Sequence, residues 1–223
     1  MKFIVLSCLL LTGTITNAQT DSSTLLNEAR AKLSDHSATV SSILSDKKYL
    51  SIHPSTSFRK LIEANASTAI LKIVTTEEPG KKIRVLGTVK DKEGKPVNGA
   101  TIYLYQTDSK GWYAADAPHV LQNEGDMRHA RLFGYVKADA AGKFELHTVK
   151  PSGYPRSDLP AHIHIHVRVN DSERYVTELL FDDDDRLVGT IREQSVRNQF
   201  LIAKPEKATT GFDQQFSYQL IVR

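Results

Sequence analysis

The chain has 223 residues, with 29 lysines and arginines against 26 aspartates and glutamates, and a formal net charge of +3 at pH 7. This near-neutral balance, without any long run of lysine and arginine, argues against a nucleic-acid partner. The length is ample for one well-buried core.

The first eighteen residues have the features of a secretory signal peptide. Lys2 precedes a short apolar run over residues 3–11, and small residues end the segment. The run is too short for a membrane span, so we predict cleavage after Ala18 and export to the periplasm or the extracellular space. Cys8 is the only cysteine and lies inside this segment, so the mature chain can form neither disulfides nor thiolate metal sites.

Residues 19–69 are predicted to form a small N-terminal helical extension. Apolar residues recur at helical spacing between residues 20 and 48, interrupted by serine and aspartate, which predicts one or two helices. A further short helix is expected within residues 55–67, opened by a serine or threonine cap.

From Ile70 onward the pattern changes to short strands separated by turns. Asp-x-x-Gly sequences begin at Asp91, Asp108 and Asp139, and this pattern suits type I turns between antiparallel strands. A turn at 170–173, a polar helix at 190–199 and a last strand at 214–223 complete the expected elements. Regularly spaced short strands predict an all-β fold, an antiparallel β-sandwich, over residues 70–223.

The stretch AHIHIHVRV, residues 161–169, places three histidines at every second position of a predicted strand. Its isoleucines and valines face the core, so His162, His164 and His166 share the opposite face. Alternate residues of a strand are about 6.6–7 Å apart, so two imidazoles can share one metal through bonds of about 2.1 Å. His162 and His166 are twice as far apart, which leaves His166 outside such a site. A solvated or hydrogen-bonded sheet face would explain the same pattern without a metal.

Two tyrosines lie in turn-rich segments near this strand. Tyr154 stands between Gly153 and Pro155, whose backbone preferences fix the loop and therefore the direction of the tyrosine. Tyr113 follows the turn at Asp108, at the expected edge of the sheet. Taken singly, either tyrosine could serve packing as readily as chemistry.

Together these segments resemble the intradiol ring-cleavage dioxygenases, the family of catechol and protocatechuate dioxygenases. The resemblance covers residues 83–182 and rests on VLGTVKDKEGKPVNGATIYLYQTDSKGWY, RLFGYVKADAAGKFELHTVKPSGYP and LPAHIHIHV. The Gly-Tyr-Pro loop followed closely by Pro-Ala-His-x-His is its most specific part. The resemblance implies a β-sandwich of the intradiol type and a non-haem Fe(III) held by two tyrosinates and two histidines. By position these ligands are Tyr113, Tyr154, His162 and His164.

The implied ligand set suits ferric iron. Fe(III) is a hard cation that favours phenolate oxygen, and a metal can deprotonate a tyrosine well below its usual pKa of about 10. The resemblance implies that a catechol binds as a dianion and displaces one tyrosinate, with the leaving groups accepting its protons. O2 then opens the ring between the two hydroxylated carbons to give a cis,cis-muconate-type product. The implied partners are a small aromatic diol and O2, and the implied role is catabolism of aromatic compounds.

Three positions depart from the family pattern. Leu159 stands where the family usually has an arginine, a fixed cation that stabilises negative charge on the substrate. Glu178 falls where glutamine is frequent, and His166 where an apolar residue is usual. These residues, with Trp112 beside Tyr113, are candidates for the substrate pocket.

The segment between Tyr113 and Arg131 is expected to form a long loop beside the site. His119, Arg128, His129 and Arg131 are candidates for the missing positive charge, and a solvated polar loop is the alternative explanation.

Two other functions remain open. The sequence DKEGKPVNGA also fits the opening of non-catalytic β-sandwich binding or interaction domains, in which the metal site would be a relic. The presence of two tyrosines and two histidines argues against that alternative. The site could instead hold Zn or Cu, which histidines also suit. A homodimer through the N-terminal helices, as in some members of the resembling family, is not decided by this sequence.

Overall fold

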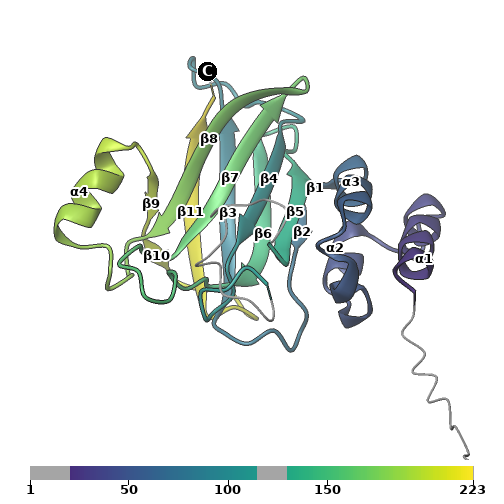
Figure 1. Cartoon of the computed structure of the whole chain (residues 1–223). Helices are drawn as coiled ribbons and strands as arrows, with labels where there is room; N and C mark the ends of the chain where they lie inside the picture. Colours follow the sequence, from purple (N-terminus) through teal and green to yellow (C-terminus); the bar gives the residue numbers. More distant parts are fainter. Residues whose placement is uncertain (1–20, 115–129, 223) are drawn as a thin grey trace, which may run out of the picture.

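The computed structural model describes residues 21–114 and 130–222, which form two stacked β-sheets flanked by helices (Figure 1). The predicted signal peptide, residues 1–18, and three of the cationic candidates, His119, Arg128 and His129, lie outside the described residues.

The two sheets confirm the predicted β-sandwich. The first has the strand order β1 (Ser67–Thr68), β5 (Leu132–Lys137), β4 (Thr101–Gln106), β7 (His162–Val169), β8 (Ser172–Phe181) and β9 (Leu201–Ala203). The second has the order β10 (Pro205–Glu206), β11 (Gln214–Ile221), β3 (Lys82–Lys90), β6 (Lys143–Val149) and β2 (Ile70–Lys72).

Both sheets are mixed rather than purely antiparallel. The pairs β5·β4, β4·β7, β7·β8 and β3·β6 are antiparallel, whereas β1·β5, β2·β6, β8·β9 and β11·β3 are parallel. Parallel neighbours need a crossover connection, and helix α4 (Gly189–Arg197) supplies the one between β8 and β9. The parallel pairs therefore arise where a strand is reached by a crossover rather than by a hairpin.

The three Asp-x-x-Gly turns are formed as predicted. The carbonyl oxygens of Asp91, Asp108 and Asp139 accept hydrogen bonds from the glycine three residues later, at 3.0, 3.1 and 2.9 Å. The first and third turns lie on the connections β3–β4 and β5–β6, which pass from one sheet to the other, so they do not close hairpins between paired strands. The turn expected at 170–173 does close a hairpin, between β7 and β8.

More helix precedes the sheets than the sequence pattern predicts. The elements are α1 (Ser22–Ser34), α2 (Val40–Leu44), the 3₁₀ helix η1 (Lys47–Ile52) and α3 (Thr56–Ala64). The cap predicted for α3 is confirmed, because the Ser55 hydroxyl accepts a hydrogen bond from the Phe58 amide. Arg59 of α3 donates to the Tyr103 hydroxyl at 2.8 Å and so ties the helices to β4. In Figure 1 these helices lie beyond the edge formed by β1 and β5, and α4 lies beyond β9 at the opposite edge.

The apolar face of β7 packs into the core between the sheets. Ile163, Ile165 and Val167 are 1% exposed or less, and burial of each contributes roughly 1.5–3 kcal/mol. His162 on the opposite face is also buried, so a solvated histidine face is excluded there. Within residues 21–114 and 130–222, no helix has both the length and the apolarity to cross a bilayer.

Candidate metal centre

Strand β7 places the imidazoles of His162 and His164 side by side. Their Nε2 atoms lie 3.1 Å apart. The cross-strand neighbour of His164 on β4 is Tyr105, whose ring stacks on the imidazole at a centroid distance of 4.4 Å and an angle of 10°. This stacking fixes the plane of the His164 ring, because the cross-strand partner leaves it no room to turn.

Two loops bring the tyrosines to the histidines. The Asp108 carboxylate accepts from the amides of Lys110 and Trp112, at 2.8 and 3.0 Å, and so sets the turn before Tyr113. Gly111 at the end of that turn has φ 84°, and a methyl group there would lie 2.3 Å from the Gly153 carbonyl oxygen. The two tyrosine-bearing loops therefore touch at Gly111, and only glycine permits that approach.

The four side chains form a ring of donor atoms. The Tyr113 hydroxyl lies 2.7 Å from that of Tyr154 and 2.8 Å from His164 Nε2, and the Tyr154 hydroxyl lies 3.0 Å from His162 Nε2. Adjacent ligands at about 2.1 Å from one ion are about 3 Å apart when they meet at right angles. The donor set and its spacing therefore fit a single metal ion with two phenolate oxygens and two imidazole nitrogens.

The protonation of the ring suits a cation. His162 Nδ1 lies 2.8 Å from the Pro160 carbonyl oxygen, which only accepts, so this nitrogen carries the proton and Nε2 directs its lone pair at the other donors. Burial, and next the neighbouring His162, lower the pKa of His164 far below its usual range, so its imidazole is neutral. Burial, and next Tyr154, raise the pKa of the Tyr113 phenol, so its phenolate needs a nearby positive charge to form.

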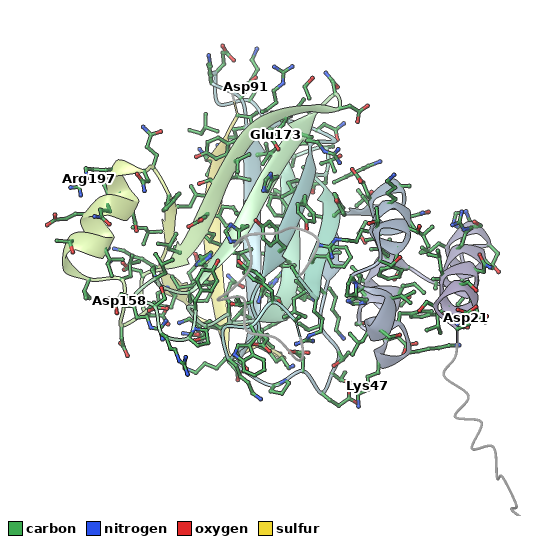
Figure 2. All side chains as sticks on the ribbon, viewed as in Figure 1. Asp21, Lys47, Asp91, Asp158, Glu173 and Arg197 are labelled. Atoms are coloured by element: carbon green, nitrogen blue, oxygen red, sulfur yellow. The ribbon has the colours of Figure 1, made fainter. Side chains whose placement is uncertain are left out.

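A cavity of about 520 Å³ opens beside the donor ring. Tyr154, His162 and His164 contribute to its wall, and so do Leu159 and Glu178, two of the residues predicted for the substrate pocket. Helix α4 and the residues after it close the other side; there the wall comprises Ile191, Gln194, Ser195, Asn198 and Phe200. Figure 2 shows Asp158, in the loop before β7, and Arg197, on α4, at this side of the sandwich.

Glu178 lies beside the donor ring, whereas His166 lies farther along the strand. Glu178 faces His164 across the β7–β8 pair, with Oε1 3.6 Å from His164 Nδ1. Among the described residues, His162, His164 and Glu178 form a group whose ligand atoms lie within 4.8 Å of one another. His166 lies further along β7, where its Nδ1 is 3.1 Å from the Glu173 carboxylate, at the hairpin end of the strand (Figure 2).

The structure does not place Arg131 or Trp112 in the cavity wall. The Arg131 guanidinium donates to both carboxylate oxygens of Glu78, at 2.6 and 2.7 Å. Arg131 directly precedes β5, and Glu78 lies in the segment before β3. Arg131 is therefore paired with a carboxylate that lies outside the residues lining the cavity. Trp112 is half-buried, with the Lys110 amine 5.9 Å from its ring.

Two residues that position the site were not predicted from the sequence. The Asp184 carboxylate accepts from the Ala161 amide at 2.8 Å, immediately before the histidine strand, and Arg186 reaches the Tyr154 loop. Asp184 is part of the acidic run DDDD at residues 182–185, and Arg186 directly follows it.

A family model described as Dioxygenase matches residues 55–223, which is more than half of the chain. The chain belongs to the intradiol ring-cleavage dioxygenase family. Catechol 1,2-dioxygenase 1 of Acinetobacter lwoffii is 28% identical over 150 residues, which are 60% of this chain and 46% of that protein. Chlorocatechol 1,2-dioxygenase of Rhodococcus opacus is 29% identical over 128 residues, 50% of this chain and 48% of that protein. The chain thus spans about half the length of these curated relatives.

Solved structures support the same fold for this member of the intradiol family. Catechol 1,2-dioxygenase from Pseudomonas arvilla C-1 superposes with a TM-score of 0.55 at 21% identity, over 71% of this chain and 58% of that one. The dioxygenase domain of a dioxygenase and carbohydrate-binding protein fusion from Streptomyces sp. SirexAA-E gives 0.51 at 23% identity, over 70% and 88% of the two chains. At these identities the likeness establishes the β-sandwich and nothing finer.

Proposed function

We propose that this intradiol family member is a non-haem Fe(III) enzyme that cleaves a catechol-type ring with O2 to a cis,cis-muconate-type product. The observation that carries the proposal is the ring of four donors, Tyr113, Tyr154, His162 and His164, with neighbouring atoms 2.7–3.1 Å apart. Three of the four, Tyr154, His162 and His164, line a cavity. Two hard oxygen donors beside two imidazoles favour a ferric ion over a softer metal.

Ferric iron held there would orient a catechol and make its ring reactive toward O2. Tyr154 lines the cavity and belongs to a loop, so it is the tyrosine best placed to leave the donor ring and accept a proton from a substrate hydroxyl. Tyr113, His162 and His164 stay in place as the supporting donors. Leu159 and Phe200 add apolar surface to the cavity wall, against which the substrate ring could pack.

Export is a separate part of the proposal. Lys2, the apolar run over residues 3–11 and the small residues up to Ala18 support a cleaved signal peptide and an enzyme that acts in the periplasm or outside the cell. Amino-terminal sequencing of the protein recovered outside the cytoplasm should begin at Gln19. A mature protein that retains Lys2 would contradict export by this route.

One specific observation supports an alternative in which a divalent metal is bound in place of iron. His162, His164 and Glu178 form a group of two histidines and one carboxylate, a set that also binds divalent metals. In that arrangement the Glu178 carboxylate would replace the tyrosines as the oxygen donor. Such a site would lack any tyrosinate absorption.

The visible spectrum of the purified protein, with iron, zinc and copper quantified on the same sample, tests the proposal. We expect close to one iron per chain, a tyrosinate-to-iron absorption band and a change of that band when catechol is added. Tyr154→Phe should remove or strongly alter the band, since one of the two phenolates is lost. A colourless protein that stays metal-free after iron reconstitution, or an unchanged spectrum in the variant, would contradict the ligand assignment.

A further inference from the structure

The charge of the cavity wall bears on which catechols can bind, and this inference rests on the proposed function. Among the described residues that line the cavity, Glu178 is the one carboxylate. The same stretch of wall contains neither lysine nor arginine. A substrate in this cavity therefore meets one fixed negative charge and no fixed positive charge from these residues.

The Glu178 carboxylate has no lysine or arginine partner within the described part of the chain. Its contact is with the donor residue His164, whose Nδ1 lies 3.6 Å from Oε1. The Glu178 side chain is 28% exposed, so it is only partly screened by water. Its field is thus felt inside the cavity rather than cancelled at the wall.

Arg186, Arg192 and Lys150 each have partners in the structure around this wall. Arg186 Nη1 donates to the carbonyl oxygens of Tyr154 and Leu159, at 3.1 and 3.3 Å. Arg192 of α4 pairs with Asp182 at 2.6 Å, and Lys150 pairs with Asp183 at 2.7 Å. For a substrate carboxylate to pair with Arg192 or Lys150, one of these ion pairs would have to break.

The remaining wall suits neutral groups. Leu159, Leu180, Ile191 and Phe200 are apolar, and Gln194 and Asn198 offer uncharged hydrogen-bonding amides. The volume of about 520 Å³ falls within the range of roughly 300–1,000 Å³ usual for sites that bind molecules larger than a single ring. The cavity therefore has room for a substituent on the catechol ring that reaches toward α4.

We propose that the cavity selects uncharged, ring-substituted catechols and rejects catechols that carry a carboxylate, and that Glu178 is the residue that sets this preference. Both kinds of catechol would present the same two oxygens to the metal, so the difference lies at the ring substituent. A second carboxylate beside Glu178, in a wall whose described residues include no lysine or arginine, brings like charges together in a poorly screened site. Specificity then comes from rejection of the charged substrate as well as from binding of the neutral one.

Equilibrium binding to the protein loaded with Ga(III), a hard trivalent ion without redox chemistry, tests the preference apart from turnover. Titration calorimetry would compare 4-methylcatechol with 3,4-dihydroxybenzoate, and kcat/KM of the iron-loaded enzyme would be measured for the same pair. We expect 3,4-dihydroxybenzoate to bind at least about tenfold more weakly, and Glu178→Gln to reduce this ratio at least about threefold. Leu159→Arg, which places a cation in the wall at a half-exposed position, should reduce it further.

Glu193→Gln is the matched control, since it removes the same charge from a residue of α4 whose side chain is 67% exposed. It should leave the ratio unchanged. Equal binding of the two compounds by the unmodified protein, or an unchanged ratio in Glu178→Gln, would overturn the inference while leaving the dioxygenase proposal intact. Failure of the metal-loaded protein to bind either compound would overturn both.

Discussion

Arg186 Nη1 donates hydrogen bonds to the carbonyl oxygens of Tyr154 and Leu159, at 3.1 and 3.3 Å. One guanidinium nitrogen thus joins the two ends of the loop that carries Tyr154. The Asp184 carboxylate also accepts from the Arg186 amide at 2.8 Å and from the Ala161 amide at 2.8 Å. The segment that follows β8 therefore sets the position of a proposed iron ligand about thirty residues before it in the chain.

Arg186→Ala should weaken iron binding, since the Tyr154 loop has no strand hydrogen bonds to hold it in place. Residues that position ligands typically contribute about 10–100-fold to metal affinity, and we expect a loss in that range with a shifted tyrosinate band. Competition with a chelator measures the affinity, and Arg186→Lys should recover part of it.

Arg197→Ala, at an α4 residue whose side chain is 64% exposed, is the control for removal of an arginine from this side of the molecule. If Arg186→Ala and Arg197→Ala have the same iron affinity and the same absorption, the Tyr154 loop holds its position without the Arg186 guanidinium.

Gly111→Ala should cost both stability and the metal site. The residue has φ 84°, and a methyl group there would lie 2.3 Å from the Gly153 carbonyl oxygen, so the two tyrosine loops would have to separate. Gly94 ends an equivalent Asp-x-x-Gly turn with φ 82°, but a methyl group there meets nothing within 4 Å. The two variants share the backbone strain and differ in the collision.

Urea unfolding should therefore show Gly111→Ala about 1–3 kcal/mol less stable than Gly94→Ala, the usual range for an overpacked contact. Iron binding should be weakened in the first variant alone. Equal losses of stability with intact iron binding in both would mean that the contact between the loops is dispensable.

His53 should make the protein sensitive to acid. Burial lowers the pKa of His53 to about 4 from its usual value of 6.5, so the folded state keeps a neutral imidazole that the unfolded chain would protonate. The stabilisation is complete above pH 6.5 and is lost as the pH falls toward 4. The difference corresponds to about 3 kcal/mol at most.

Unfolding free energies measured between pH 7 and pH 4 check this. His53→Asn retains a donor for the Arg131 carbonyl, which lies 2.9 Å from His53 Nδ1, and should show a shallower fall with acid. His36→Asn removes an exposed histidine and should follow the unmodified protein. A parallel fall in all three proteins would assign the acid sensitivity to other groups.

Local sequence patterns were enough for most strands and turns. A period of two in AHIHIHVRV places the isoleucines in the core, and Asp-x-x-Gly closes a turn through hydrogen bonds within five residues. The pattern failed where contacts are distant in the chain. The parallel pairing of β9 with β8 and of β11 with β3 depends on crossovers. Arg131 forms its ion pair with Glu78, 53 residues earlier in the chain.

The β-sandwich and the spacing of two tyrosines and two histidines that resembles one family could be predicted from the amino-acid sequence, because alternation and turn chemistry act over a few residues. Three features depend on the packing of the folded chain: the four donor atoms converge within 2.7–3.1 Å, α4 closes the cavity, and Glu178 faces it in a wall whose described residues include no lysine or arginine. Those relationships depend on how loops and helices pack against the sheet. Burial and long-range partners, which no local pattern specifies, set the charge and the direction of each side chain there.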